Sequence, residues 1–249
     1  MSKRSTHSNK KKGLPKGVPW SAGAVFLLGI AIIAGIYWEQ NTKVTDLRFH
    51  GNSFTADEQL HAVIESPVGL HSDSVDYRGL IEQVHTLPWV RSATISMEAR
   101  GTMTFRIQER EPIGLIVENE KRAYVDRDGI KLPLVLNQPV DVPLVYGFSA
   151  EPVGDTLNTD PFGNVRDFLL AARSNGFGWA TLSEVGYNPR EGVIAMSHEN
   201  GVKLLFGHDN YEEKLRYWET FYAEVVRTKG IQQVSEVDLR FRGQVVTRN

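Results

Sequence analysis

A long apolar run near the start of the chain dominates its hydropathy pattern. No charged residue interrupts the segment from Trp20 to Trp38, which reads WSAGAVFLLGIAIIAGIYW. Its length is close to the ~20 residues that a helix needs to cross a ~30 Å hydrocarbon layer. A cleaved signal peptide would need small residues near its end, whereas Tyr37 and Trp38 are bulky. The run therefore predicts an uncleaved transmembrane helix over residues 18–38.

Apolar positions after this run first follow a mixed helix and strand pattern, up to about residue 111. A helix is expected to start at Thr55, whose hydroxyl suits an N-cap with Glu58 three residues later. The pattern predicts, in order, a strand Val44–His50, a helix from Thr55 that Pro67 stops, a helix Ser74–His85, and a hairpin of Trp89–Met97 and Thr102–Gln108. This order predicts a compact α+β unit in which both helices cover one face of a small sheet.

From Pro112 onward, short alternating runs and turn residues predict a second, mostly antiparallel β domain with two helices. The expected strands are Ile113–Glu118, Arg122–Val125, Leu144–Tyr146, Ser183–Tyr187, Gly192–Met196, Val202–Phe206 and Ser235–Phe241. The expected helices are Phe162–Ser174 and Tyr211–Lys229. The predicted fold class is therefore α+β, with an N-terminal transmembrane helix before the two folded parts.

The charge distribution predicts how the chain is oriented across the membrane. Residues 1–17 contain no acid and six cations, namely Lys3, Arg4, Lys10, Lys11, Lys12 and Lys16. We expect this basic tail to be disordered and to stay in the cytoplasm by the positive-inside rule. Removing these six cations from the net charge of −2 leaves −8 for the rest of the chain. The bulk is then extracytoplasmic, and its acidity disfavours nucleic acid as a partner.

The sequence shows no arrangement of residues that is typical of a catalytic site or a metal site. The chain has no cysteine, which removes disulfides, zinc-thiolate sites and thiol nucleophiles. No two of its histidines have the i, i+4 spacing with an intervening Glu that a zincin helix needs. Gly147 to Glu151 nearly forms a nucleophile elbow but lacks the final glycine. We therefore expect a binding protein that is not an enzyme and has no metal, no cofactor and no small-molecule substrate.

Several ordered motifs make the chain resemble the FtsQ/DivIB family of bacterial division proteins. They are VTDLRFHGN at Val44–Asn52, LPWV at Leu87–Val90, EREPI at Glu109–Ile113, the YVDxDG turn at Tyr124–Gly129, and VDLRF at Val237–Phe241. The resemblance implies a POTRA domain at residues 44–111 and a β domain at 112–249. It also implies anchoring in the cell inner membrane and recruitment to the division septum.

The resemblance further implies a noncatalytic divisome scaffold that links early and late division proteins. Its partners would be FtsB- and FtsL- or DivIC-like proteins, through which it would influence septal peptidoglycan synthesis. The resemblance implies that the last strand binds the partner, together with two residues beside it. The strand residues are Val237, Asp238, Leu239, Arg240 and Phe241, and the residues beside it are Arg242 and Gln244. An exposed strand edge pairs with a partner's backbone, while side chains beside it give specificity. Phe241 stands where the family has Tyr.

Three other functions remain open at this level. A POTRA-bearing assembly or secretion protein would have tandem modules or a long barrel region. A membrane-anchored envelope hydrolase would need a nucleophile with a base, or a metal cluster. A tethered domain without a specific partner differs from the divisome scaffold only in how its last strand behaves.

Overall fold

The computed structural model describes residues 20–40, 43–227, 230 and 234–248. Its first element, α1 (Trp20–Gln40), confirms a helix along the apolar run. Within the described ranges, no helix has both the length and the apolar character to cross a membrane. The predicted membrane crossing over 18–38 begins outside the described residues and stays a prediction. The predicted tail, 1–17, lies wholly outside them.

A three-stranded sheet with two helices follows α1. Its elements are β1 (Asp46–His50), α2 (Asp57–Val63), the 3-10 turn η1 (Ser72–Ser74), α3 (Tyr77–Val84), β2 (Val90–Met97), the 3-10 turn η2 (Ala99–Gly101) and β3 (Thr102–Glu109). The strand order is β1-β3-β2, with β1 parallel and β2 antiparallel to β3. The strand, helix, helix, strand, strand order matches the sequence-based prediction.

The first helix of this unit starts later than the sequence predicts. Ala56 holds the N-cap position of α2, and its backbone N–H donates to the Gln59 side chain at 3.0 Å. Thr55, the expected cap, is buried, and its hydroxyl makes no hydrogen bond among the described residues. The helix instead depends on Leu60, which is fully buried in the core of this unit.

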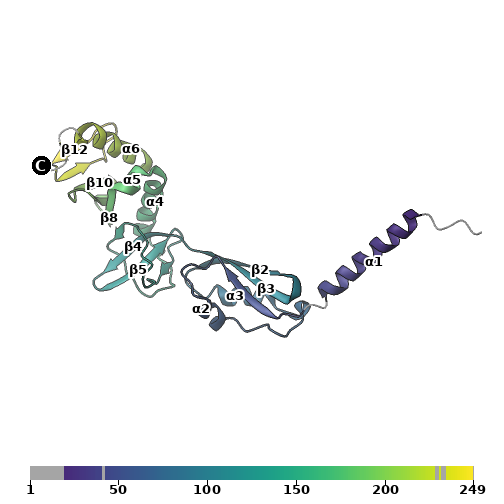
Figure 1. The fold of residues 1–249 in the computed structure, drawn as a ribbon. Coiled ribbons are helices and arrows are strands. Elements are labelled where there is room, and N and C mark those ends of the chain that lie inside the picture. The colour runs from purple at the N-terminus through teal and green to yellow at the C-terminus, as the bar shows by residue number, and fades with distance from the viewer. Residues whose placement is uncertain (1–19, 41–42, 228–229, 231–233, 249) are drawn as a thin grey trace, which may run out of the picture.

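The rest of the chain builds a nine-stranded sheet. Its strands are β4 (Pro112–Glu118), β5 (Lys121–Asp126), β6 (Lys131–Leu132), β7 (Leu144–Val145), β8 (Leu182–Asn188), β9 (Gly192–Ser197), β10 (Lys203–Gly207), β11 (Glu236–Asp238) and β12 (Val246–Arg248). The order is β12-β11-β10-β9-β8-β7-β4-β5-β6. Most neighbours are antiparallel as predicted, but β4–β7, β7–β8 and β10–β11 are parallel. Figure 1 shows this sheet beyond the smaller one, with β12 at the far end.

Three helices, where two were predicted, accompany this sheet within the described residues. They are α4 (Asp160–Asn175), α5 (Phe177–Thr181) and α6 (Tyr211–Phe221), the last continuing as a π-helical turn, η3 (Tyr222–Val226). The Thr159 hydroxyl caps α4 by accepting a hydrogen bond from the Phe162 backbone at 3.4 Å. α4 packs against α6 and β8, and the apolar faces of the helices and the sheet form one core. The end of the predicted helix, residues 228–229, lies outside the described part.

Aromatic and charged contacts join the two sheets. Phe54 of the first unit stacks on Trp89 at a centroid distance of 4.2 Å, and Trp89 meets Tyr124 of β5 edge to face at 6.1 Å. Beside them, Arg110 donates to the buried carboxylate of Asp126 at 2.7 Å. The predicted turn after β5 is therefore part of the joint between the two units.

Glu109, at the end of β3, anchors the loop before α2. Its carboxylate accepts hydrogen bonds from the backbone N–H groups of Ser53, Phe54 and Thr55 at 2.7–3.0 Å. Hydrogen bonds to a charged acceptor contribute more than neutral ones. We expect Glu109→Gln to lower the free energy of unfolding by about 1–3 kcal/mol, measured by urea denaturation. Glu111→Gln is the control, because Glu111 makes a solvent-exposed pair with Arg173; an equal loss in both variants would contradict the anchoring role.

Candidate partner-binding site

The last two strands differ from the single exposed strand that the sequence predicts. β11 covers residues 236–238 of the predicted 235–241, and it lies inside the sheet. β10 pairs with it in parallel, with Leu204 opposite Val237, and β12 pairs with it on the other side, with Thr247 opposite Val237. The strand expected at 235–241, whose edge the sequence left open as free or covered, is therefore paired on both sides, on one of them by a strand that was not predicted.

β12 is the outer strand at this end of the sheet. It stands last in the strand order, and among the described residues it pairs with β11 alone. All of its residues, 246–248, are exposed, and the Val246 side chain is 41% exposed. An outer strand presents a row of backbone N–H and C=O groups that another chain can pair with. Within the described part of the chain, the outer edge of the sheet is thus formed by residues 246–248 and not by residues 237–241.

An aspartate ends β11 and starts the turn that leads to β12. The Asp238 carboxylate accepts a hydrogen bond from the backbone N–H of Arg240 at 3.1 Å, which is the local side-chain bonding that competes with strand pairing. The Arg240 guanidinium forms an ion pair with the same carboxylate, to which its Nε donates at 2.8 Å. Leu239 still donates its backbone N–H to Leu205 at 3.0 Å. The chain therefore leaves the sheet just before Phe241.

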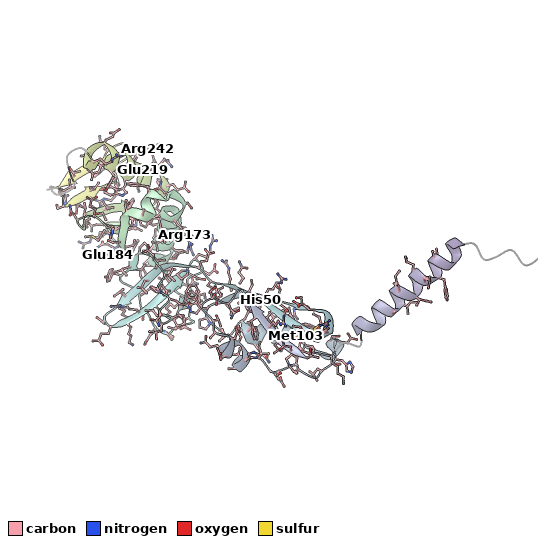
Figure 2. All side chains as sticks on the ribbon, in the orientation of Figure 1. His50, Met103, Arg173, Glu184, Glu219 and Arg242 are labelled. Atoms are coloured by element: carbon pink, nitrogen blue, oxygen red, sulfur yellow. The ribbon has the colours of Figure 1, made fainter. Side chains whose placement is uncertain are left out.

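This turn places the predicted site residues on two sides. Val237, Asp238 and Leu239 are buried, and Val237 and Leu239 belong to the hydrophobic core. Phe241, Arg242 and Gln244 are exposed, and Phe241 is 51% exposed. Figure 2 shows Arg242 at the end of the molecule that also carries Glu219 of α6, far from His50 and Met103 of the smaller sheet.

A pocket lies between this turn and α6. Its volume is about 240 Å³, and it is lined by Asp209, Asn210, Glu213, Lys214, Tyr217, Leu239, Arg240, Phe241 and Arg242. Lys214 is nearly buried and donates to the Asp209 carboxylate at 2.9 Å. That hydrogen bond, with the charge of Lys214, holds the pKa of Asp209 below its usual range. The pocket therefore presents fixed charges of both signs beside an exposed aromatic ring.

The turn is tied to α6 by a single hydrogen bond of the described residues. The backbone N–H of Gly243 donates to the Tyr217 hydroxyl at 3.3 Å, and Gly243 has φ of +69°, a conformation that favours glycine. The sequence signal for β12 follows directly, because Val245, Val246 and Thr247 are β-branched residues after a glycine turn. This run of β-branched residues is the one local signal for β12, since its exposed residues show no hydrophobic alternation.

Burial favours the neutral form of Asp238, but the hydrogen bonds from Arg240 outweigh it and lower its pKa from the usual 3.8. A lowered folded-state pKa means that the carboxylate adds stability at higher pH and loses it as the pH falls through that pKa. We expect the free energy of unfolding to fall more steeply below pH 3.8 in the wild type than in Asp238→Asn. Parallel pH profiles from urea denaturation would contradict this contribution.

No group of three or more His, Asp or Glu side chains is arranged to hold a metal ion in the described ranges. The site geometry instead consists of an open strand edge, an exposed aromatic ring and a small charged pocket. These features suit recognition of a polypeptide by backbone pairing and side-chain contact.

Curated relatives that match most of this chain share one name. "Cell division protein FtsQ" of Salinibacter ruber is 27% identical over 240 residues, which cover 91% of this chain and 92% of that protein. "Cell division protein FtsQ" of Rhodothermus marinus is 24% identical, covering 100% of this chain and 94% of that protein. A third, from Geotalea daltonii, is 25% identical, covering 69% of this chain and 62% of that protein.

A solved structure and a family profile complete the comparison. The major extracytoplasmic domain of the trans isomer of the cell division protein DivIB from Geobacillus stearothermophilus aligns with a TM-score of 0.34 and 17% identity. That alignment covers 48% of this chain and 97% of the solved one. The profile described as "FtsQ/DivIB, C-terminal related" matches residues 111–248. Because this match spans more than half of the sequence, the chain belongs to the FtsQ/DivIB family.

Proposed function

We propose that this chain is a cell-division protein that acts as a noncatalytic scaffold by binding FtsB- and FtsL- or DivIC-like partners. The observation that carries this proposal is the open outer edge of β12. Family membership supports a division role, and the curated relatives bear the name of a division protein. In this role the chain would help to control when septal peptidoglycan synthesis is switched on.

The proposed interface is a strand of the partner added to β12. The partner's backbone would pair with residues 246–248, and an apolar partner side chain would cover the exposed Phe241 ring. Arg242 and Gln244 lie on the exposed turn next to it. Contacts of exposed charges contribute only about 0–1 kcal/mol and mainly guide the encounter. Backbone pairing and Phe241 therefore account for most of the affinity.

We also propose that α1 anchors the chain in the cell inner membrane, with residues 1–17 in the cytoplasm and the two sheets outside it. Large apolar side chains of α1 are exposed, among them Val25, Phe26, Leu27, Leu28, Ile30, Ile32 and Ile33. Water-soluble proteins rarely expose a continuous apolar surface of this kind. The smaller unit, residues 44–111, would be a POTRA domain and residues 112–249 the β domain that recruits partners.

Replacing Phe241 by Glu tests the proposed interface. We expect the full-length variant in bilayer discs to bind an FtsB-like protein roughly 30-fold more weakly than the wild type, since a buried aromatic anchor contributes about 2 kcal/mol or more. Leu136→Glu is the matched control: Leu136 is an exposed apolar residue, 86% exposed, beyond β6 at the opposite end of the strand order. Circular dichroism checks folding of both variants.

Each outcome of this experiment is informative. Loss of binding in Phe241→Glu with binding retained in Leu136→Glu supports the interface. Equal binding by both folded variants would move partner recognition to another surface. A wild-type protein that binds neither FtsB- nor FtsL-like proteins would remove the scaffold function itself.

A further inference from the structure

The end of the smaller sheet that receives the chain from α1 carries an exposed apolar turn. The backbone N–H of Leu70 donates to the carbonyl of Pro67 at 3.0 Å and closes the turn. Gly69 within it has φ of +94°, a conformation that favours glycine. Val68 and Leu70 on this turn are 50% and 49% exposed, whereas Pro67 is buried. Two large aliphatic side chains therefore project from a fixed backbone.

Hydrogen bonds attach this turn to the segment that follows α1. The backbone N–H of Val44 donates to the carbonyl of Leu70 at 2.9 Å, and the backbone N–H of Gly69 donates to the carbonyl of Val44 at 2.8 Å. Lys43 and His71 form an isolated β-bridge beside them. The Val44 side chain is 1% exposed and belongs to the core. These hydrogen bonds therefore hold the turn in a fixed position relative to Val44.

The chain length between α1 and Val44 limits how far the turn can lie from the helix. α1 ends at Gln40, and the four Cα steps to Val44 span at most about 14 Å when fully extended. The headgroup layer on each side of the hydrocarbon core is roughly 5–8 Å thick. If α1 crosses the bilayer, as proposed above, the turn is held within reach of the lipid interface.

Basic side chains flank the turn at the same end of the sheet. The β2–β3 connection packs on the segment after α1, because Thr45 donates its backbone N–H to Gly101 at 2.8 Å and its hydroxyl to Arg100 at 3.0 Å. Arg100 and Lys43 are both exposed. Long basic side chains beside apolar ones suit the boundary between phosphates and acyl chains. Exposed acids also lie at this end, namely Asp46, Glu65, Asp73 and Glu98. They limit the electrostatic contribution, which leaves the apolar pair as the main contact.

We propose that the Pro67–Leu70 turn inserts Val68 and Leu70 into the phospholipid interface next to α1. The inference rests on the proposed membrane anchoring and extends it to a second contact. Two aliphatic side chains would bind a membrane weakly by themselves, but the short tether makes their insertion intramolecular, at a high effective concentration. The contact fixes the tilt of the smaller sheet on the membrane and thereby the height at which β12 is presented.

Spin labels at single cysteines test this contact in the full-length protein. The chain has no cysteine, so Val68→Cys and Leu70→Cys each give one labelled site in phospholipid bilayer discs. We expect the ratio of collisions with oxygen to collisions with a water-soluble nickel complex to be several-fold higher at these sites than at Leu136→Cys. Leu136 is the control because it is an exposed apolar residue of the larger unit. Ile30→Cys reports separately on α1.

The four labels distinguish failure of this inference from failure of the anchoring. A lipid signal at Ile30 with water-like signals at positions 68 and 70 overturns the insertion and leaves the anchor intact. A water-like signal at Ile30 removes both. Low access to both reagents at positions 68 and 70 means that protein covers the turn, which also overturns lipid insertion.

Discussion

Trp218→Ala is expected to lower the free energy of unfolding by about 3–5 kcal/mol, the range for removing a buried aromatic side chain. Trp218 of α6 is fully buried, and its ring contacts Phe177, Phe221 and Tyr222 at centroid distances of 5.6–6.5 Å. Its indole N–H donates to the Thr181 hydroxyl at 2.9 Å. The truncation would leave a cavity where α5, α6 and η3 meet and would remove one partner of the Thr181 hydroxyl, which keeps its own hydrogen bond to the Phe177 carbonyl at 2.9 Å.

Trp218→Phe separates the two contributions in the same measurement, chemical denaturation followed by circular dichroism. The phenyl ring keeps most of the packing but cannot donate to Thr181, so we expect a smaller loss of about 1–2 kcal/mol. Losses below about 1 kcal/mol for Trp218→Ala would show that this end of the core is loosely packed. It would then be a poor support for the turn that Tyr217 holds through Gly243.

Arg110→Met is expected to cost about 3 kcal/mol, because it removes the charge partner of a buried carboxylate. Asp126 is 1% exposed and accepts hydrogen bonds from Arg110 at 2.7 Å and from the backbone of Asp128 and Ile130 at 2.9 and 2.8 Å. Breaking a buried pair costs about 3–5 kcal/mol. The two backbone bonds remain in the variant, which places the expected value at the lower end of that range.

A surface pair at the same turn provides the control. Arg91 lies 3.3 Å from the Asp128 carboxylate, and both side chains are more than a third exposed. Arg91→Met should therefore cost no more than about 1 kcal/mol. The double variant Arg110→Met with Asp126→Asn should recover part of the loss, since no unpaired charge remains. No recovery would mean that Arg110 acts through packing of its alkyl chain.

Local patterns predicted the elements of the first unit well because each helix and strand there buries one regular face. In β3, alternation puts Met103, Phe105 and Ile107 in the core. The cap of α2 was wrong by one residue because Thr55 turns inward while Gln59 supplies the side-chain acceptor. The joint was also missed, since Glu109 and Arg110 were considered only as part of the EREPI motif.

The second unit was harder to predict because its sheet order depends on contacts between distant segments. The parallel pairs β4–β7 and β7–β8 join strands that no local pattern links. α5 is a short helix with Gly178 inside it, so its sequence resembles a helix stop. The length of β11 was overestimated because Asp238 ends it through its own side chain. β12 is too short and too exposed for hydrophobic alternation to reveal.

The structure shows where the residues of the predicted site lie, while partner binding by them stays a prediction. The sequence led to residues 237–244, and the structure places Phe241, Arg242 and Gln244 on an exposed turn. It also shows that Val237 lies in an interior strand, paired on both sides. The proposed interface thus depends on β12, a strand that no motif predicted.

Backbone amide hydrogen exchange of the full-length protein in bilayer discs, with and without an FtsB-like partner, tests the strand-addition interface most directly. Residues 246–248 are exposed on the outer strand of the sheet, so partner pairing should slow their exchange markedly, while exchange around Leu136 should not change. Binding that leaves exchange at residues 246–248 unchanged and protects another surface would contradict strand addition at β12.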